Sequence, residues 1–233
     1  MSSSDLDPSG EQSGAVIGDR ALAAWEIASV ASSVLIAEWI LSAAMGRSKV
    51  VVAIPIALAF LLMISSHRLR GESLRDLGFR FDTFWRAGKL LLLPMFLIGI
   101  LCLVAGWWFG GEMNFLRWHA GRPIAGQLLL GFGWGLVQQY VLQGFINRRA
   151  QIIWGQGWLS ALLVAIVFGG LHLPNPWLTL VTFAGGAIWA AVYQRAPNLF
   201  ALAVSHSLMT WVLVSTLPAP ALNHLRIGFK YFG

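Results

Sequence analysis

The sequence predicts an all-α fold, a polytopic bundle of membrane-spanning helices, and three observations support this prediction. Of the 233 residues, 57% are hydrophobic and only 11% are charged, which is about half the charged fraction of an ordinary soluble domain. Several apolar segments are about 20 residues long, the length that a helix needs to cross a bilayer. Prolines at 123, 174, 176 and 197 lie at or near the ends of these segments, where a missing backbone N–H costs least.

The segments between these boundaries give seven predicted transmembrane helices. They span residues 21–44, 50–66, 86–109, 124–146, 157–173, 177–194 and 198–217. Residues 1–20 are small, polar and acidic, with too little apolar surface to fold alone, so we expect a disordered N-terminal tail there. The bundle therefore covers residues 21–217, and residues 218–233 form a predicted C-terminal tail. This pattern predicts a multi-pass protein of the cell membrane.

Basic residues are concentrated between the apolar segments. Nine of the 16 Lys and Arg residues lie in the loops after predicted helices two, four and six or, as Arg86 and Lys89 do, in the first turn of the helix that follows. We therefore predict that these loops are cytoplasmic and that both termini lie outside. The same distribution argues against a nucleic-acid-binding surface. Residues 72–84 are predicted to form a short interfacial segment with Leu74, Leu77, Phe81 and Phe84 on one side.

Polar side chains inside the predicted helices mark candidate functional positions, because they are costly in hydrocarbon. They are Glu26, Glu38, Gln127, Gln138, Gln139, Gln143, His172 and His206. From the helical rise, Gln139 and His206 lie about 13–14 Å from the predicted cytoplasmic end of their helices, and His172 about 22 Å. These similar depths favour one shared cavity near the bilayer midplane. A single glutamine or histidine can alternatively just bond a neighbouring helix.

Other intramembrane residues have simpler expected roles. Glu26 and Glu38 lie near helix ends, where we expect them to reach the interface or pair with a neighbour. The single Cys102 excludes an intramolecular disulfide and is expected to be a packed, inert thiol. The glycines of predicted helices four to six indicate close helix packing and carry no chemistry. They are Gly131, Gly133, Gly135, Gly169, Gly170, Gly185 and Gly186.

Three short motifs follow one another in the C-terminal half of the chain. The first is QQYVLQ, residues 138–143; the second is FGGLH, residues 168–172; the third is HSLMT, residues 206–210. Their order and spacing resemble the CAAX prenyl protease and bacteriocin-processing (CPBP, or Abi) family of intramembrane proteases, whose pattern is EExxxR, FxxxH and HxxxN. The resemblance covers about residues 72–217, including a basic segment, ESLRDLGFR, before predicted helix three.

The resemblance implies an intramembrane endopeptidase that cleaves a prenylated or membrane-associated peptide by water attack. It places Gln138 at the position of the proposed general base, and Gln139 and Gln143 in place of an acid–base pair at i,i+4. By the same resemblance, His172 would hold or polarise the attacking water. His206 would face the developing oxyanion together with Thr210, which replaces the usual asparagine.

The first motif departs from the family because glutamines replace its ionisable residues. Exchanging both partners of an ion pair for neutral amides leaves no buried charge uncompensated, so the architecture is expected to survive. An amide cannot accept a proton at neutral pH, whereas imidazole titrates near neutrality. We therefore expect His172 or His206 to act as the base. No cofactor is predicted, and no metal, because a neutral amide would be a weak third ligand beside two histidines.

Two other functions compete with the endopeptidase. The first is a catalytically inactive family member that binds a membrane peptide or a partner protein in the cavity that holds the active site in the family. The second is a small-solute transporter or channel subunit, which the absence of an internal repeat and of a charge-lined path disfavours. Other intramembrane proteases are disfavoured because the sequence has no HExxH motif and no aspartate pair in the predicted helices. Ser205 and Ser207 are next to His206 in the sequence, but neighbours on a helix point away from each other. A serine–histidine dyad within this segment is therefore not expected.

Overall fold

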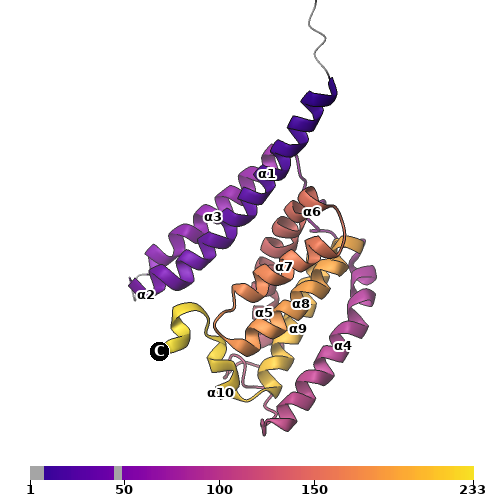
Figure 1. The fold of residues 1–233 in the computed structure, drawn as a ribbon. Coiled ribbons are helices and arrows are strands. Elements are labelled where there is room, and N and C mark those ends of the chain that lie inside the picture. Colours follow the sequence, from indigo (N-terminus) through magenta and orange to yellow (C-terminus); the bar gives the residue numbers. More distant parts are fainter. Residues whose placement is uncertain (1–7, 45–48) are drawn as a thin grey trace, which may run out of the picture.

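The computed structural model describes residues 8–44 and 49–233, and within these ranges all regular elements are helical (Figure 1). The elements are α1 (Pro8–Leu35), η1 (Ile36–Leu41), α2 (Ser42–Ala44), α3 (Lys49–Leu69), α4 (Phe84–Trp108), α5 (Ile124–Gln139), η2 (Tyr140–Asn147), α6 (Arg148–Trp154), α7 (Trp158–Gly170), α8 (Pro176–Arg195), α9 (Leu199–Thr216), α10 (Ala219–Leu222), η3 (Asn223–Leu225) and η4 (Gly228–Phe232). The segments η1 and η2 are π-helices that continue α1 and α5. The predicted all-α bundle is confirmed.

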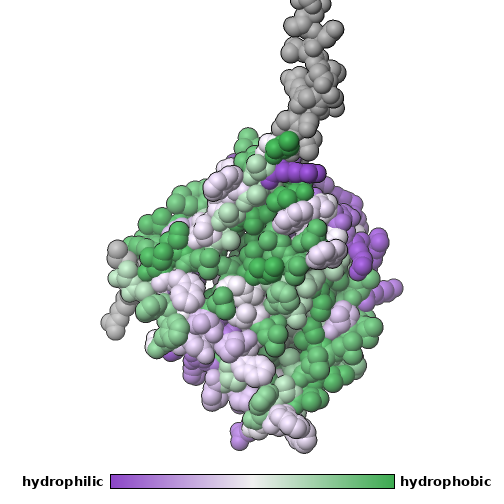
Figure 2. All heavy atoms as spheres, in the orientation of Figure 1, coloured by the Kyte–Doolittle hydropathy of each residue, from purple (hydrophilic) through white to green (hydrophobic). Residues whose placement is uncertain are grey.

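Among the described residues, five helices are long and apolar enough to cross a membrane. They are Ile17–Ala44, Val50–Leu69, Phe84–Trp108, Pro176–Arg195 and Leu199–Thr216. The other two predicted spans are also helical, residues 124–146 as α5 with η2 and residues 157–173 as the shorter apolar α7. Hydrophobic side chains cover much of the surface in Figure 2, which is how a protein embedded in a lipid bilayer looks. The count of seven crossings stays a prediction.

The helices divide into a hairpin and a compact group. Helices α1 and α3 lie side by side, while α4, α5, α7, α8 and α9 pack together beside them (Figure 1). Within this group α5 packs on α9 and α7 on α8, and the candidate site lies among these helices. The hairpin contacts the group mainly through α6 near one end and through the C-terminal segment near the other.

The predicted location of the N-terminus was wrong. Asp19, near the start of the apolar span Ile17–Ala44, forms an ion pair with Arg70, in the loop after α3, with 2.6 Å between Oδ1 and Nη1. The beginning of this span therefore lies at the arginine-rich end of the bundle, which was assigned to the cytoplasm. The opposite end holds the last helices of the chain (Figure 1). With the seven crossings predicted, an odd number, the two termini lie on opposite sides of the membrane, so they cannot both lie outside.

The two predicted tails and the interfacial segment also differ from expectation. Residues 1–7 of the predicted tail 1–20 lie outside the described residues, but α1 begins at Pro8, since extending an existing helix costs far less than starting one. Residues 218–233 fold back as α10, η3 and η4. Residues 72–83 form turns, and Leu77 is buried while Leu74 and Phe81 are exposed, so they do not share one side.

Close packing at glycines brings α5 against α9. A Cβ added to Gly131 would lie 2.2 Å from a ring carbon of Trp118 and 2.6 Å from the Ser207 hydroxyl, and one added to Gly135 would lie 3.3 Å from Cβ of His206. Gly133 has nothing within 4 Å. The predicted close packing is thus confirmed at Gly131 and Gly135 and not at Gly133, which lies on the opposite face.

This difference predicts opposite effects for two matched substitutions. Gly131→Ala is expected to lower the free energy of unfolding by about 1–3 kcal/mol, the typical cost of overpacking. Gly133→Ala is expected to leave stability unchanged or raise it by up to about 1 kcal/mol, through helix propensity. Thermal unfolding in detergent measures both. Equal shifts for the two variants would contradict the packing described.

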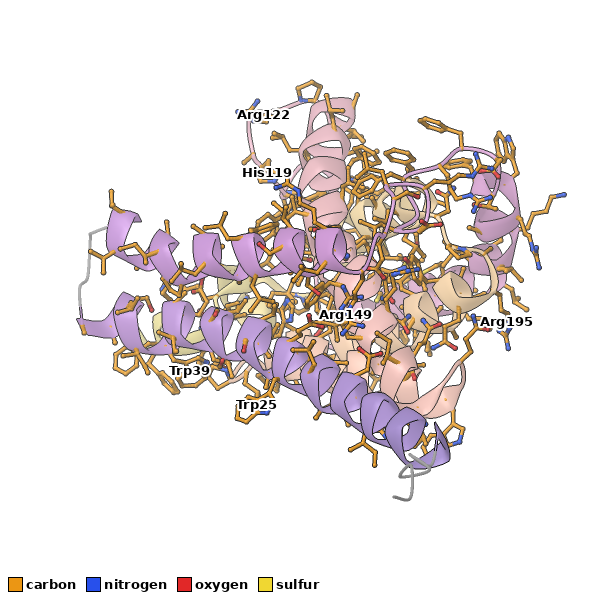
Figure 3. The ribbon with its side chains drawn as sticks, turned by 90° about the horizontal axis from the view of Figure 1, so that it is seen from above. Trp25, Trp39, His119, Arg122, Arg149 and Arg195 are labelled. Carbon is orange, nitrogen blue, oxygen red and sulfur yellow. The ribbon has the colours of Figure 1, made fainter. Side chains whose placement is uncertain are left out.

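A buried network of charges joins the hairpin to the rest of the bundle. Arg149 is completely buried; its Nε lies 2.9 Å from a carboxylate oxygen of Glu26, and its Nη2 lies 2.8 Å from one of Glu72. Glu72 also accepts hydrogen bonds from Arg148 and from Nδ1 of His67. Figure 3 shows Arg149 where the hairpin meets the other helices. The second intramembrane glutamate, Glu38, pairs with Lys230 at 2.9 Å, so both glutamates have the pairing role expected of them.

This network predicts that acid destabilises the protein. Burial by itself raises the pKa of Glu72, but hydrogen bonds from His67, Arg149 and Arg148 outweigh it and hold the pKa well below its usual value. A lowered folded-state pKa contributes stability that is complete above the unfolded-state pKa and is lost as the pH falls below it. Unfolding temperatures in detergent should therefore fall between pH 6 and pH 3, values chosen to bracket the unfolded-state pKa of a glutamate, about 4.3. A Glu72→Gln variant that keeps the full slope would contradict this assignment.

Candidate functional site

A cavity of about 520 Å³ lies between α4, α5, α8 and α9, and two residues of the C-terminal segment, Leu225 and Ile227, also line it. Most of its lining is apolar, with tryptophan, methionine and leucine side chains contributed by several elements. Its polar side chains include four of the predicted site residues, Gln138, His172, His206 and Thr210. The structure thus brings residues from all three motifs to one cavity, as their similar depths predicted.

His172 follows the end of α7 and lies in a turn. Its Nδ1 is 2.7 Å from the backbone carbonyl of Phe168, one helical turn earlier. A carbonyl oxygen can only accept, so Nδ1 carries the ring proton and donates it in this hydrogen bond. In its neutral form the ring therefore has its lone pair on Nε2, and Nε2 makes no hydrogen bond to another described residue. His172 therefore offers a proton acceptor to the cavity.

His206 is held on three sides by α5, α8 and α7. The side-chain amide of Gln139 donates from Nε2 to Nδ1 of His206 at 3.2 Å, which leaves the ring proton on Nε2. The imidazole stacks on Trp189, with 4.7 Å between ring centroids and 9° between the planes. Phe168 contacts the rings of both histidines edge-on, at 4.8 Å for His172 and 5.9 Å for His206. This phenylalanine of the FGGLH motif therefore fixes the two imidazoles relative to each other.

The three glutamines of the first motif have different surroundings. Gln138 lines the cavity, and its Oε1 is buried without a hydrogen-bond partner among the described residues. Gln139 is completely buried and contacts His206. Gln143 is completely buried too, but its Oε1 accepts from Nδ2 of Asn147 at 2.8 Å, and it is absent from the cavity lining described.

The predicted amide pair between Gln139 and Gln143 is therefore not formed. The spacing i,i+4 places side chains together on an α-helix. From Tyr140 to Asn147, however, the helix is of the wider π type, in which hydrogen bonds join i to i+5. Gln139 ends the α-helical part and turns toward α9, whereas Gln143 lies within the π segment and turns toward Asn147.

Three residues around the site were not predicted. Trp189 supports His206 by stacking, His119 lines the cavity from the loop before α5, and Asn147 joins Gln143 to Gln151 and Gln194. His119 and its neighbour Arg122 lie together on that loop (Figure 3). Of these three, Asn147 carried a sequence signal, because polar residues recur every four positions at 139, 143, 147 and 151.

Three other polar residues of these helices form hydrogen bonds that do not involve the two histidines. Gln127 donates from its side-chain amide to the carbonyl of Arg122, which is a helix-end contact. Ser205 accepts a hydrogen bond from the indole N–H of Trp189, and Ser207 donates to the carbonyl of Leu128. Neither serine hydroxyl is bonded to His206. Among the described residues, no group of three or more His, Cys, Asp or Glu is placed to hold a metal ion.

Comparison with known proteins identified one family. Residues 120–212 match the family model described as type II CAAX prenyl endopeptidase Rce1-like. The matched region contains QQYVLQ, FGGLH and HSLMT, together with α5, η2, α7 and α8. The match confirms the family resemblance that these motifs predict. Neither a search of curated proteins nor a search of solved structures found a match.

Proposed function

On the premise that residues 120–212 make the chain a member of the CAAX prenyl protease family, we propose that it is an intramembrane endopeptidase of the cell membrane. Its substrate is a prenylated or otherwise membrane-associated peptide, and water is the nucleophile. The observation that carries the proposal is that His172 and Gln138, each with an acceptor that no other described residue uses, line the same cavity. The Nε2 lone pair of His172 and the unpartnered Oε1 of Gln138 both belong to side chains that line it.

These two acceptors could both accept a hydrogen bond from one water molecule. A water donates two hydrogen bonds, one to each acceptor, and keeps a lone pair for attack. Gln138 Oε1 is buried without a protein partner, and an unsatisfied buried acceptor is costly unless a water bonds to it. Gln138 orients this water but cannot take its proton, so His172 acts as the general base.

The reaction then proceeds in two proton transfers. His172 Nε2 takes a proton from the water as the water oxygen bonds to the carbonyl carbon of the scissile peptide. The negative charge that develops on the carbonyl oxygen is stabilised by the Nε2–H of His206 and the hydroxyl of Thr210. When the C–N bond breaks, the imidazolium of His172 gives its proton to the leaving amine. The products are a carboxylic acid and an amine, and the histidine returns to its neutral form.

Gln139 and Gln143 act through other residues in this proposal. By donating to Nδ1, Gln139 keeps the proton of His206 on Nε2, where an oxyanion donor is required. Gln143 lies farther along η2 and bonds to Asn147, so it supports the helix and does not touch the substrate. Both are positioning residues.

The second candidate is an inactive relative that binds a membrane peptide or partner protein in the same cavity. The observation that favours it is the first motif itself, in which three neutral amides stand where the family has ionisable groups. The cavity would then retain its shape and its mostly apolar lining and lack a carboxylate base.

A cleavage assay in proteoliposomes separates the two candidates. Wild-type protein is incubated with a library of prenylated and transmembrane peptides, and products are identified by mass. We expect slow cleavage by the wild type and a rate increase of about 10²-fold or more for Gln138→Glu, because a positioned general base is worth that much. Gln138→Leu removes the water acceptor without adding a base and should be slower than wild type.

The outcomes differ clearly. Cleavage by the wild type establishes the endopeptidase. Peptide binding without cleavage, by both the wild type and Gln138→Glu, would support the binding protein and reject the endopeptidase. Activity that appears only in Gln138→Glu would identify an inactive relative whose cavity is otherwise complete.

A further inference from the structure

The C-terminal segment is fastened beside His172. This segment, residues 219–232, comprises α10, η3 and η4 and is called the strap below. Two of its side chains, Leu225 and Ile227, line the cavity, and Leu222 is buried beneath it among apolar residues of α8 and α9. The strap therefore forms the wall of the cavity at the end opposite α6 (Figure 1).

One buried asparagine holds the strap. Asn175 is completely buried, and its Nδ2 donates to the carbonyls of Leu222, at 2.8 Å, and Arg226, at 3.2 Å. Its Oδ1 accepts from the backbone N–H of Leu178 and so caps α8. Its own backbone N–H donates to the carbonyl of His172 at 3.1 Å. Asn175 thus joins the strap, the start of α8 and the turn that carries His172.

Two further polar attachments join the strap to other described residues. The backbone N–H of Gly228 donates to the carbonyl of Leu173, at 2.8 Å, and Lys230 pairs with Glu38 at 2.9 Å. This ion pair is partly exposed, so it contributes less than a buried pair would, but it is the one side-chain ion pair described between the strap and the hairpin.

Between these attachments the backbone is strained. Asn223, His224 and Leu225 have φ angles of 43°, 53° and 60°, in the left-handed region that residues other than glycine avoid. Asparagine and histidine adopt this conformation with some ease, but leucine does so rarely, so the strain lies chiefly at Leu225. A strained segment persists only while its surroundings hold it. Here the surroundings are the two hydrogen bonds from Asn175 together with the apolar packing of Leu222, Leu225 and Ile227.

We infer that the strap is a releasable wall of the cavity, and that Asn175 is the positioning residue that latches it and the His172 turn together. With the latch closed, the cavity is shut at this end and His172 is held in place. With the latch open, the strain in residues 223–225 is relieved and the cavity opens. Opening of the strap does not depend on the proposed function. Only an effect of opening on peptide cleavage rests on that function.

The chain contains its own reporter of opening. Cys102 is the single cysteine in the sequence, it lines the cavity, and it is 6% exposed. Alkylation of its thiol by a membrane-permeant maleimide therefore measures access to the cavity without an engineered probe. Labelling in the unfolded protein gives the maximum value.

Two isosteric substitutions form the test. Asn175→Asp keeps the oxygen that caps α8 and removes the two donors to the strap. Asn198→Asp is the matched control: Asn198 caps α9 in the same way and donates to the carbonyl of Arg80 at the other end of the bundle. We expect Asn175→Asp to raise the rate of Cys102 labelling about tenfold, as the loss of two hydrogen bonds does for a local opening equilibrium, and Asn198→Asp to match wild type.

A second variant keeps the test decisive if Asn175→Asp does not fold. Lys230→Met cuts the attachment to Glu38 and should raise labelling by a smaller factor. Wild-type labelling rates in folded Asn175→Asp or, failing that, in Lys230→Met would overturn the inference, as would rapid labelling of the wild type itself. Faster labelling without any peptide cleavage would support the strap and reject only the endopeptidase.

Discussion

Replacing His172 by alanine is expected to slow peptide cleavage by about 10²–10⁴-fold, the contribution of a positioned general base. The loss should fall on kcat, with little change in KM, because the imidazole acts on the water and not on the bound peptide. The geometry behind this expectation is the hydrogen bond from Nδ1 to the Phe168 carbonyl, which leaves Nε2 as a proton acceptor. Initial rates in proteoliposomes at saturating peptide measure it.

The matched control for this substitution is His119→Ala. His119 lines the same cavity but lies on an exposed loop, outside the three motifs. A general loss of cavity shape would affect both variants, whereas loss of the base affects His172→Ala alone. Unchanged kcat in His172→Ala would require another base and would reject the proposed mechanism.

Replacing Arg149 by leucine is expected to lower the free energy of unfolding by about 3–5 kcal/mol, which is the cost of breaking a buried ion pair by removing one partner. Glu26 and Glu72 would remain buried without their shared cation. Denaturation of the purified protein in mixed micelles, followed by circular dichroism, measures the loss. Arg68→Leu is the surface control, because Arg68 is exposed, and it should change stability by less than about 0.5 kcal/mol.

A compensating variant tests the cause of this loss. The triple change Arg149→Leu, Glu26→Gln and Glu72→Gln removes both carboxylate charges together with the cation. It should recover much of the stability, since a buried ionic cluster exchanged as a whole is often nearly neutral. If the triple variant is less stable than Arg149→Leu, the network stabilises through packing and hydrogen bonds and not through charge.

The sequence predicted the fold class and the meeting of the motifs because both follow from the bilayer. A helix must be about 20 residues long to cross hydrocarbon, so depth can be counted along the chain. Gln139 and His206 were placed at the same depth by counting, and they lie within hydrogen-bond distance in the structure. The pairing roles of Glu26 and Glu38 followed in the same way from their nearness to helix ends.

Other features could not be derived from helical periodicity. The π segment η2 changes which residues share a face, so the partners of Gln143 were misjudged. The buried position of Arg149 depends on two carboxylates, one on α1 and one in the loop after α3, that are distant in sequence. The sequence predicts only a tail at residues 218–233, because the hydrogen bonds from Asn175 that hold the strap leave no periodic pattern in the sequence.

The π segment η2 also limits the insertions and deletions that this helix can tolerate without loss of the site. A π turn is equivalent to one residue more than an α-helix needs, and each residue of an α-helix rotates its side chain by about 100°. Deleting one residue between Tyr140 and Asn147 would therefore turn Gln138 and Gln139 away from the histidines while α6 and Arg149 kept their places. The length of η2 therefore sets the rotation of Gln138 and Gln139, at the cavity, relative to Arg149, in the buried charge network.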